Sequence, residues 1–163
     1  MSARQSRGRK PKDDRPERVR FPTPVNRLRI RVADGEWSVE KQVDIPSMTL
    51  RGSAPRPTAR KGFGRSGFWV DAVDAQGRVI YRAKQRNPFR RTVELFETSG
   101  EMQRKDSKRE QALFDVLIPD RSDIVELRFY SSFSPDGQRL SDAELIHTLR
   151  RGRDKKEGGR YGD

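Results

Sequence analysis

The sequence predicts a mainly β protein: an antiparallel, immunoglobulin-like β-sandwich of about seven or eight strands, with one short C-terminal helix and basic flexible tails. Short segments of alternating apolar and polar residues follow one another with turn signals between them, as is typical of sandwiches. Only one late segment has helical periodicity, so strands do not alternate with helices and a parallel sheet is not expected. A small barrel is the alternative fold.

The segment 67–89 contains the central hairpin of the predicted fold. Two alternating runs flank Asp74-Ala75-Gln76-Gly77, and a turn ending in glycine between such runs is typical of a β-hairpin. Phe68 and Trp69 put bulk on both faces of the first run. We therefore expect the hairpin near the middle of a sheet and not at its edge.

The first predicted strand has an apolar face and an arginine face. The alternating residues are Leu28, Ile30 and Val32 on one face and Arg27, Arg29 and Arg31 on the other. Such an arginine ladder is either a solvated face or a grip for phosphates or carboxylates.

Further strands follow along the chain. Alternation continues through 37–45, and Pro46 ends that strand or places it at an edge. Residues 92–97 predict another strand. The runs 114–118 and 125–129 flank a turn and predict a second hairpin.

Two stretches between these strands predict loops. Residues 51–67 have four glycines and five basic groups, and a loop of this length suggests a function or disorder. Its glycines resemble a GxGxxG motif, but they precede a strand instead of opening a helix, so no nucleotide site is expected. The charged stretch 100–111 lacks a pattern and favours a loop, with one or two helical turns at Lys105–Ala112 as the alternative.

A short helix is predicted after Ser134-Pro135-Asp136-Gly137. Ser141 and Glu144 have the spacing of a capping box. Leu145, Ile146 and Leu149 form one apolar stripe. The domain organisation is then a basic N-terminal arm, which is disordered alone, a sandwich domain, a capping helix and a basic C-terminal tail. The four parts are residues 1–20, 21–133, 134–151 and 152–163.

The net charge is +12, and it is concentrated in the predicted tails and loops. Such a distribution attracts a polyanion or an acidic protein surface. The candidate contact residues for that partner are Arg4, Arg7, Arg9, Lys10, Lys12, Arg56, Arg60, Lys61, Arg65, Arg86, Arg90, Arg91, Arg150, Arg151, Arg153, Lys155 and Lys156.

Residues with catalytic chemistry are scarce. The chain has no cysteine and one histidine, His147, which excludes a Cys–His pair and a zinc site of three His or Cys ligands. Asp71 and Asp74 leave a carboxylate magnesium site open, although Asp74 has a simpler role in opening its turn. We expect no enzyme, no catalytic or metal-binding residue and no cofactor.

The chain contains no run of 18 apolar residues, so no membrane span is expected. The basic N-terminus is not followed by the apolar segment of a secretory signal. We expect a cytoplasmic protein that contacts neither a membrane nor a small-molecule substrate.

Three segments resemble the accessory β-sandwich domain that precedes the catalytic domain in the IgA-peptidase-type family of zinc metallopeptidases. They are Leu28-Arg29-Ile30-Arg31-Val32, the run from Gly67 to Arg82, and Phe114-Asp115-Val116-Leu117-Ile118-Pro119. The resemblance extends from Phe21 to Ser132 and implies a sandwich fold with a non-catalytic role. The peptidase motif HExxH is absent, and no second histidine exists to complete it.

Two functions are compatible with these features. The first is an adaptor or structural subunit that docks into a larger protein assembly, with basic arms gripping acidic neighbours. The second is a nucleic-acid-binding protein without sequence specificity, whose tails and loops contact phosphates. In the second case Phe63, Trp69 and Phe89 are candidates for stacking on bases.

Overall fold

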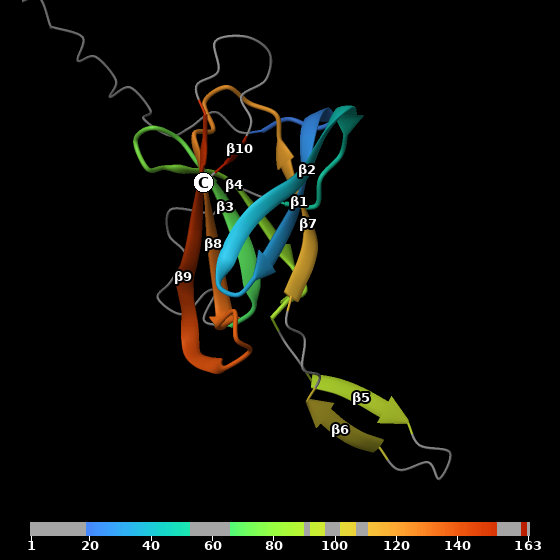
Figure 1. Ribbon diagram of the computed structural model, residues 1–163. Coiled ribbons are helices and arrows are strands. Elements are labelled where there is room, and N and C mark those ends of the chain that lie inside the picture. The colour runs from blue at the N-terminus through green and yellow to red at the C-terminus, as the bar shows by residue number, and fades with distance from the viewer. Residues whose placement is uncertain are drawn as a thin grey trace, which may run out of the picture.

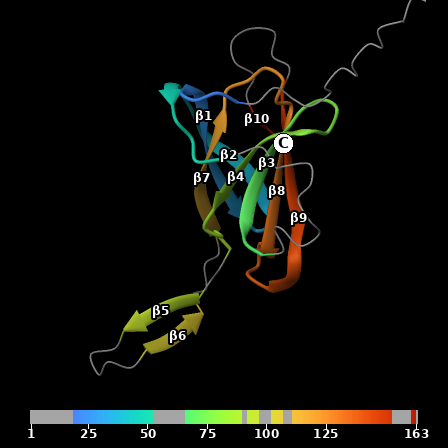
Figure 2. The ribbon, with the colours of Figure 1, turned by 180° about the vertical axis from the view of Figure 1, so that it is seen from behind.

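The structure is a computed structural model of the chain. It describes residues 19–52, 66–89, 92–96, 102–106, 111–152 and 161–162. The regular elements in these ranges are antiparallel β-strands, with no helix among them. The prediction of a mainly β protein is confirmed, and the two larger sheets lie face to face in a sandwich-like arrangement (Figures 1 and 2).

The two larger sheets have simple strand orders. The first sheet has the order β2-β1-β7, with β1 at Thr23–Ala33, β2 at Glu36–Met48 and β7 at Gln111–Pro119. The second sheet has the order β10-β9-β8-β3-β4, with β3 at Phe68–Val73, β4 at Val79–Gln85, β8 at Glu126–Phe133, β9 at Arg139–Arg151 and β10 at Tyr161–Gly162.

A separate hairpin lies between the two halves of the sequence. β5 (Thr92–Phe96) pairs with β6 (Met102–Asp106), and the two form a sheet of their own. The strand at β5 was predicted, whereas β6 lies in a stretch predicted as a loop. Backbone pairing does not require an apolar face, so the charged sequence of β6 carried no signal for a strand.

The core fills the space between the two larger sheets and contains a cluster of aromatic rings. Trp37 of β2 lies 5.7 Å from Phe89, 6.1 Å from Phe114 and 5.1 Å from Phe129, measured between ring centroids. The apolar face of β1 packs into the same core, as its alternation predicted. Aromatic pairs in such geometries add to the stabilisation from burial alone.

The central hairpin is confirmed, but only one of its strands is central. β3 lies between β4 and β8, and all six of its residues are buried. β4 is an edge strand. Bulk on both faces therefore marked the interior strand correctly, while the expectation that the whole hairpin avoids the edge is wrong for β4.

The predicted second hairpin is wrong. β7 pairs with β1 in the first sheet, while β8 pairs with β3 and β9 in the second. The connection between them crosses from one sheet to the other, and the backbone N–H of Val125 donates to the carbonyl of Val73 at 2.9 Å. Alternation identifies a strand, but it does not identify the neighbour with which that strand pairs.

The predicted helix at 134–151 is also wrong, because residues 139–151 form β9. Pairs such as Leu127 with Leu149 and Phe129 with His147 join β9 to β8. A register shift follows the Phe129 pair, and Ile146 and Leu149 both contribute to the core. A helix of about nine residues has little intrinsic stability, so pairing with β8 overrides the local capping signal.

The C-terminal end contributes to the core, although it was predicted as part of a solvated tail. Tyr161 of β10 pairs with Arg151 of β9 and is buried in the core cluster. The guanidinium of Arg151 lies 5.6 Å from the centroid of the Tyr161 ring.

Candidate functional site

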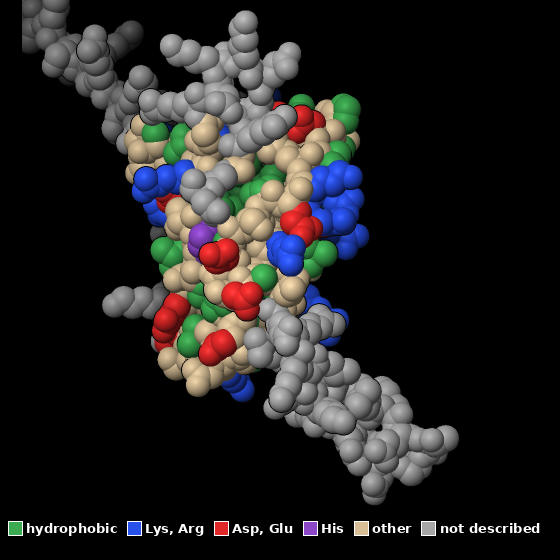
Figure 3. Space-filling view, viewed as in Figure 1, with side chains coloured by type: hydrophobic (Ala, Val, Ile, Leu, Met, Phe, Trp, Pro, Cys, Tyr) green, Lys and Arg blue, Asp and Glu red, His purple; other side chains and the backbone are tan. Residues whose placement is uncertain are grey.

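The arginine ladder of β1 binds a carboxylate within the fold. Arg29 donates from Nε to Asp115 of β7 at 3.0 Å, and Arg27 donates to the same carboxylate. The hydrogen bond from Arg29, and to a smaller extent that from Arg27, lowers the pKa of Asp115. Arg31 contacts Gln111 at 2.9 Å and Glu40 at 3.6 Å. Basic side chains gather on this flank with acidic ones beside them (Figure 3).

The outer edge of β7 belongs to the most regular edge strand of the two larger sheets. β7 is the last strand of the first sheet, and its nine residues pair with β1 without a register shift. Leu113 on this strand is 57% exposed. β4 of the second sheet approaches β7, and the part of this edge that β4 leaves open offers backbone N–H and C=O groups to another strand.

Three other strands at the edges of the two larger sheets are less suited to pairing; they are β2, β4 and β9, the last of which β10 covers only at Arg150 and Arg151. β2 contains Pro46 and a register shift opposite Arg29 and Ile30. β4 has a register shift at its start, and β9 has two. Proline, charge and bulges are the features by which proteins protect their edges.

The outer face of the second sheet has an aromatic pair beneath a buried ion pair. Trp69 stacks on Tyr130 with 5.3 Å between ring centroids. Arg82 lies over Trp69 and donates two hydrogen bonds of 2.6 Å to Asp71. The hydrogen bonds to Asp71 raise the pKa of the Arg82 guanidinium above its ordinary value.

A shallow hollow of about 610 Å³ lies beside this pair, on strands β8 and β9. Arg128 donates to Glu126 at 2.6 Å, and Arg150 lies 3.7 Å from the same carboxylate. Leu145 is 51% exposed at this site. The hollow combines an apolar side chain with paired charges, as the surfaces that contact proteins often do. Its lining residues are Glu126, Arg128, Tyr130, Leu145, Thr148 and Arg150.

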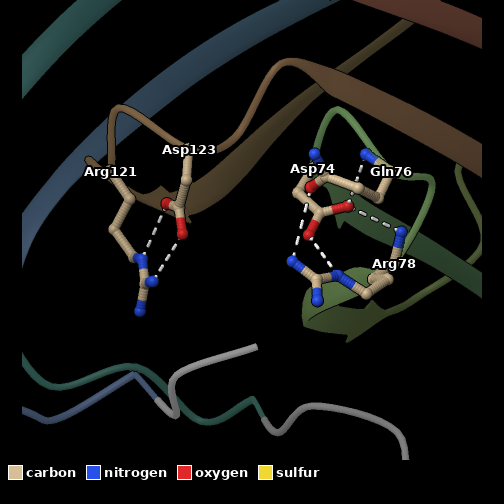
Figure 4. A network of polar contacts seen from close by, with 5 residues as sticks. All are labelled: Asp74, Gln76, Arg78, Arg121 and Asp123. Carbon is tan, nitrogen blue, oxygen red and sulfur yellow. Dashed lines mark hydrogen bonds and ion pairs between the residues drawn. The ribbon is translucent and has the colours of Figure 1, made fainter. Parts of the chain in front are cut away.

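Two short ion pairs lie side by side at one end of the sheets (Figure 4). Burial acts to raise the pKa of Asp74, but hydrogen bonds from Arg78 and from the backbone of Gln76 outweigh it and lower that pKa. Arg121 donates to Asp123 at 2.9 Å and lowers its pKa. The carboxylates of Asp74 and Asp71 each form an ion pair with an arginine. Among the described residues there is no group of three potential metal ligands.

Three of the predicted contact residues lie in the described part of the chain. Arg86 is exposed, and the side chain of Arg150 is 84% exposed. Arg151 is mostly buried, donating to Asp120 at 2.9 Å and to the carbonyl of Arg121 at 2.7 Å. The predicted contact residues outside the described ranges are Arg4, Arg7, Arg9, Lys10, Lys12, Arg56, Arg60, Lys61, Arg65, Arg90, Arg91, Arg153, Lys155 and Lys156.

Sequence reasoning missed the β7 edge and the hollow. The alternation of β7 was recognised, but its position at the end of a sheet depends on pairing with β1, 78 to 94 residues earlier in the chain. The hollow depends on β9, which was predicted as a helix.

Of the residues proposed for stacking on bases, Trp69 and Phe89 are buried, and Phe63 lies outside the described residues.

The described residues include no helix that could cross a lipid bilayer. Comparison with family models, with curated proteins and with solved structures finds no match for this chain.

Proposed function

We propose that this protein is a non-catalytic adaptor or structural subunit that docks into a larger protein assembly. Its body is an immunoglobulin-like β-sandwich, and its basic segments hold acidic neighbours. The observation that supports this most is where the charge lies. The eight strands of the two larger sheets contain ten Lys or Arg and eight Asp or Glu, so most of the +12 net charge lies outside them.

Several arginines on the sheets are already compensated by neighbouring carboxylates. Asp115 holds Arg27 and Arg29, and Asp71 holds Arg82. An external anion would have to compete with these contacts at the sheets. Charge placed in this way steers a partner of opposite sign and raises its association rate.

The alternative, binding of nucleic acid without sequence specificity, uses the same charges. The sheets would add few contacts to bound nucleic acid, because the rings of Trp69 and Phe89 are buried and cannot stack on bases. The proposal therefore favours an acidic protein partner. No catalytic step and no cofactor are part of it.

The test compares binding to nucleic acid with retention in a complex. Replacing Arg4, Arg7, Arg9, Lys10 and Lys12 with alanine should release the protein from its co-purifying protein partners at moderate salt, with the melting temperature unchanged. A variant with Arg4, Arg7 and Arg9 replaced by lysine keeps the charge and should remain bound. Affinity for random duplex DNA tighter than micromolar at 150 mM salt, falling steeply as salt rises, would instead support the nucleic-acid function.

A further inference from the structure

The outer edge of β7 carries few of the devices that keep edge strands unpaired. Its sequence has six apolar residues in nine, and its only charged residue, Asp115, is held by arginines of β1. Proline stands only at its last position, Pro119. The segment Gln111–Leu117 is therefore an apolar strand edge in regular extended geometry.

Both faces of this segment would contact an added strand. Leu113 points to the outer face of the first sheet beside Asp115, whereas Phe114 packs against the core and Val116 belongs to it. Side chains of neighbouring strands interact with residues opposite them on the same face. An added strand would therefore need apolar or β-branched residues beside Leu113 and Phe114.

We propose that an extended strand of an acidic protein partner adds to the edge of β7 at Gln111–Leu117. This inference rests on the proposed function, from which it takes the sign of the partner's charge. Main-chain hydrogen bonds would supply affinity and the alternate side chains specificity, as in other strand-addition complexes. Two copies of this chain would each bring a net charge of +12, so their mutual repulsion favours an acidic partner over a second copy.

The test uses synthetic peptides of known sequence. The first peptide alternates valine and threonine and has two aspartates at each end. A second has glutamines in place of the aspartates, and a third has N-methyl groups on alternate backbone amides, which removes the hydrogen bonds of one strand edge. Binding is measured by fluorescence anisotropy, and backbone amide exchange of the protein is measured by NMR with and without the first peptide.

Two protein variants separate the edge from a general apolar contact. Leu113→Asn changes an exposed apolar residue on β7, and Val43→Asn changes an exposed one on β2, at the opposite edge of the same sheet. Both changes are neutral in charge, and both variants should melt close to the wild type. We expect the first peptide to bind the wild type and Val43→Asn equally and Leu113→Asn about tenfold more weakly. Amides within 111–117 should exchange more slowly in the complex.

The outcomes are distinct for the two proposals. Equal binding of the first and third peptides, or equal binding to Leu113→Asn and the wild type, would show that charge alone holds the peptide and would overturn strand addition, leaving the proposed function intact. Equal binding of the first and second peptides would retain strand addition and contradict the acidic partner. Absence of binding by all three at millimolar concentration, or dimerisation abolished by Leu113→Asn, would also overturn the inference.

Discussion

The ring of His147 lies flat against the ring of Trp37, with 4.4 Å between their centroids and 7° between their planes. Trp37 belongs to β2 in the first sheet and His147 to β9 in the second. The stack therefore joins the two layers through the core. The only histidine of the chain makes a packing contact there, in a segment that local sequence signals assigned to a helix.

This stack predicts energetic coupling between the two sheets. We expect Trp37→Ala to lower the free energy of unfolding by about 3–5 kcal/mol, as for other buried aromatic residues. A double-mutant cycle with His147→Ala should give a coupling energy of about 0.5–1.5 kcal/mol, measured by urea denaturation. The control cycle pairs Trp37 with Tyr130, which lies on the outer face of the second sheet, and should be additive. Additivity in the His147 cycle would contradict the stack.

The buried pair of Asp71 and Arg82 should be far more sensitive to substitution than the exposed pair of Asp115 and Arg29. The side chain of Asp71 is 3% exposed, and that of Arg29 is 42% exposed. We expect Asp71→Ala to cost about 3 kcal/mol, because it leaves a largely buried guanidinium without its partner. Arg29→Ala should cost much less, because solvent screens an exposed ion pair. Thermal and urea unfolding give both values, and similar costs for the two changes would show that burial does not govern them.

Tyr161 should contribute to stability through its ring and not through its hydroxyl. The side chain is buried in the core, and its hydroxyl has no hydrogen-bond partner among the described residues. Tyr161→Ala should lower the free energy of unfolding by about 3 kcal/mol or more. Tyr161→Phe keeps the ring beside Arg151 and should be neutral or stabilising, since it removes an unsatisfied polar group. If both variants lower the free energy of unfolding equally, the hydroxyl of Tyr161 has a hydrogen-bond partner and this prediction is wrong.

The two buried tyrosines predict a loss of stability at high pH. Burial raises the pKa of Tyr81 to about 12, and it does the same for Tyr161. The unfolded chain releases these protons near pH 10, so the stabilising contribution is complete below pH 10 and is lost as the pH rises toward 12. Tyr161→Phe should reduce this decline. Titration of the folded protein followed by tyrosinate absorbance near 295 nm should show delayed ionisation, and a titration complete by pH 10.5 would contradict it.

The sequence predicts strands better than it predicts their neighbours. Leu28 alternates with Arg29 along β1, and that local pattern sufficed to place the core face and the ladder. The pairing of β7 with β1 involves residues far apart in the chain, and alternation contains no information about such a partner. The sequence therefore located the strand that carries Leu113 without showing that it lies at an edge.

The error at β9 has a different physical origin. Ser141 and Glu144 have the spacing of a helix cap, and Leu145, Ile146 and Leu149 also fit a helical stripe. In the structure a register shift beside Phe129 lets Ile146 and Leu149 reach the core from a strand. Tertiary pairing along β8 outweighs a local preference of this size. The hollow on β8 and β9 could not be predicted while that segment was assigned to a helix.

Acid sensitivity should be traceable to the carboxylates that hold arginines. The hydrogen bond from Arg29, with that from Arg27, lowers the pKa of Asp115 below its ordinary value of 3.8. In the unfolded chain the same group binds its proton at higher pH. Its stabilising contribution is therefore present above about pH 4 and is lost as the pH falls through the lower pKa of the folded state.

Asp115→Asn should consequently be less stable than the wild type at pH 7, and the difference should shrink as the pH falls below 4. Asp74 and Asp123 have lowered pKa values as well, so the variant should keep part of the acid-induced decline. Urea unfolding between pH 2 and pH 7 measures both effects. Glu36→Gln at the exposed start of β2 removes the same charge and serves as the control. A difference between Asp115→Asn and the wild type that stays constant across this range would show that the arginines of β1 do not stabilise the ionised carboxylate.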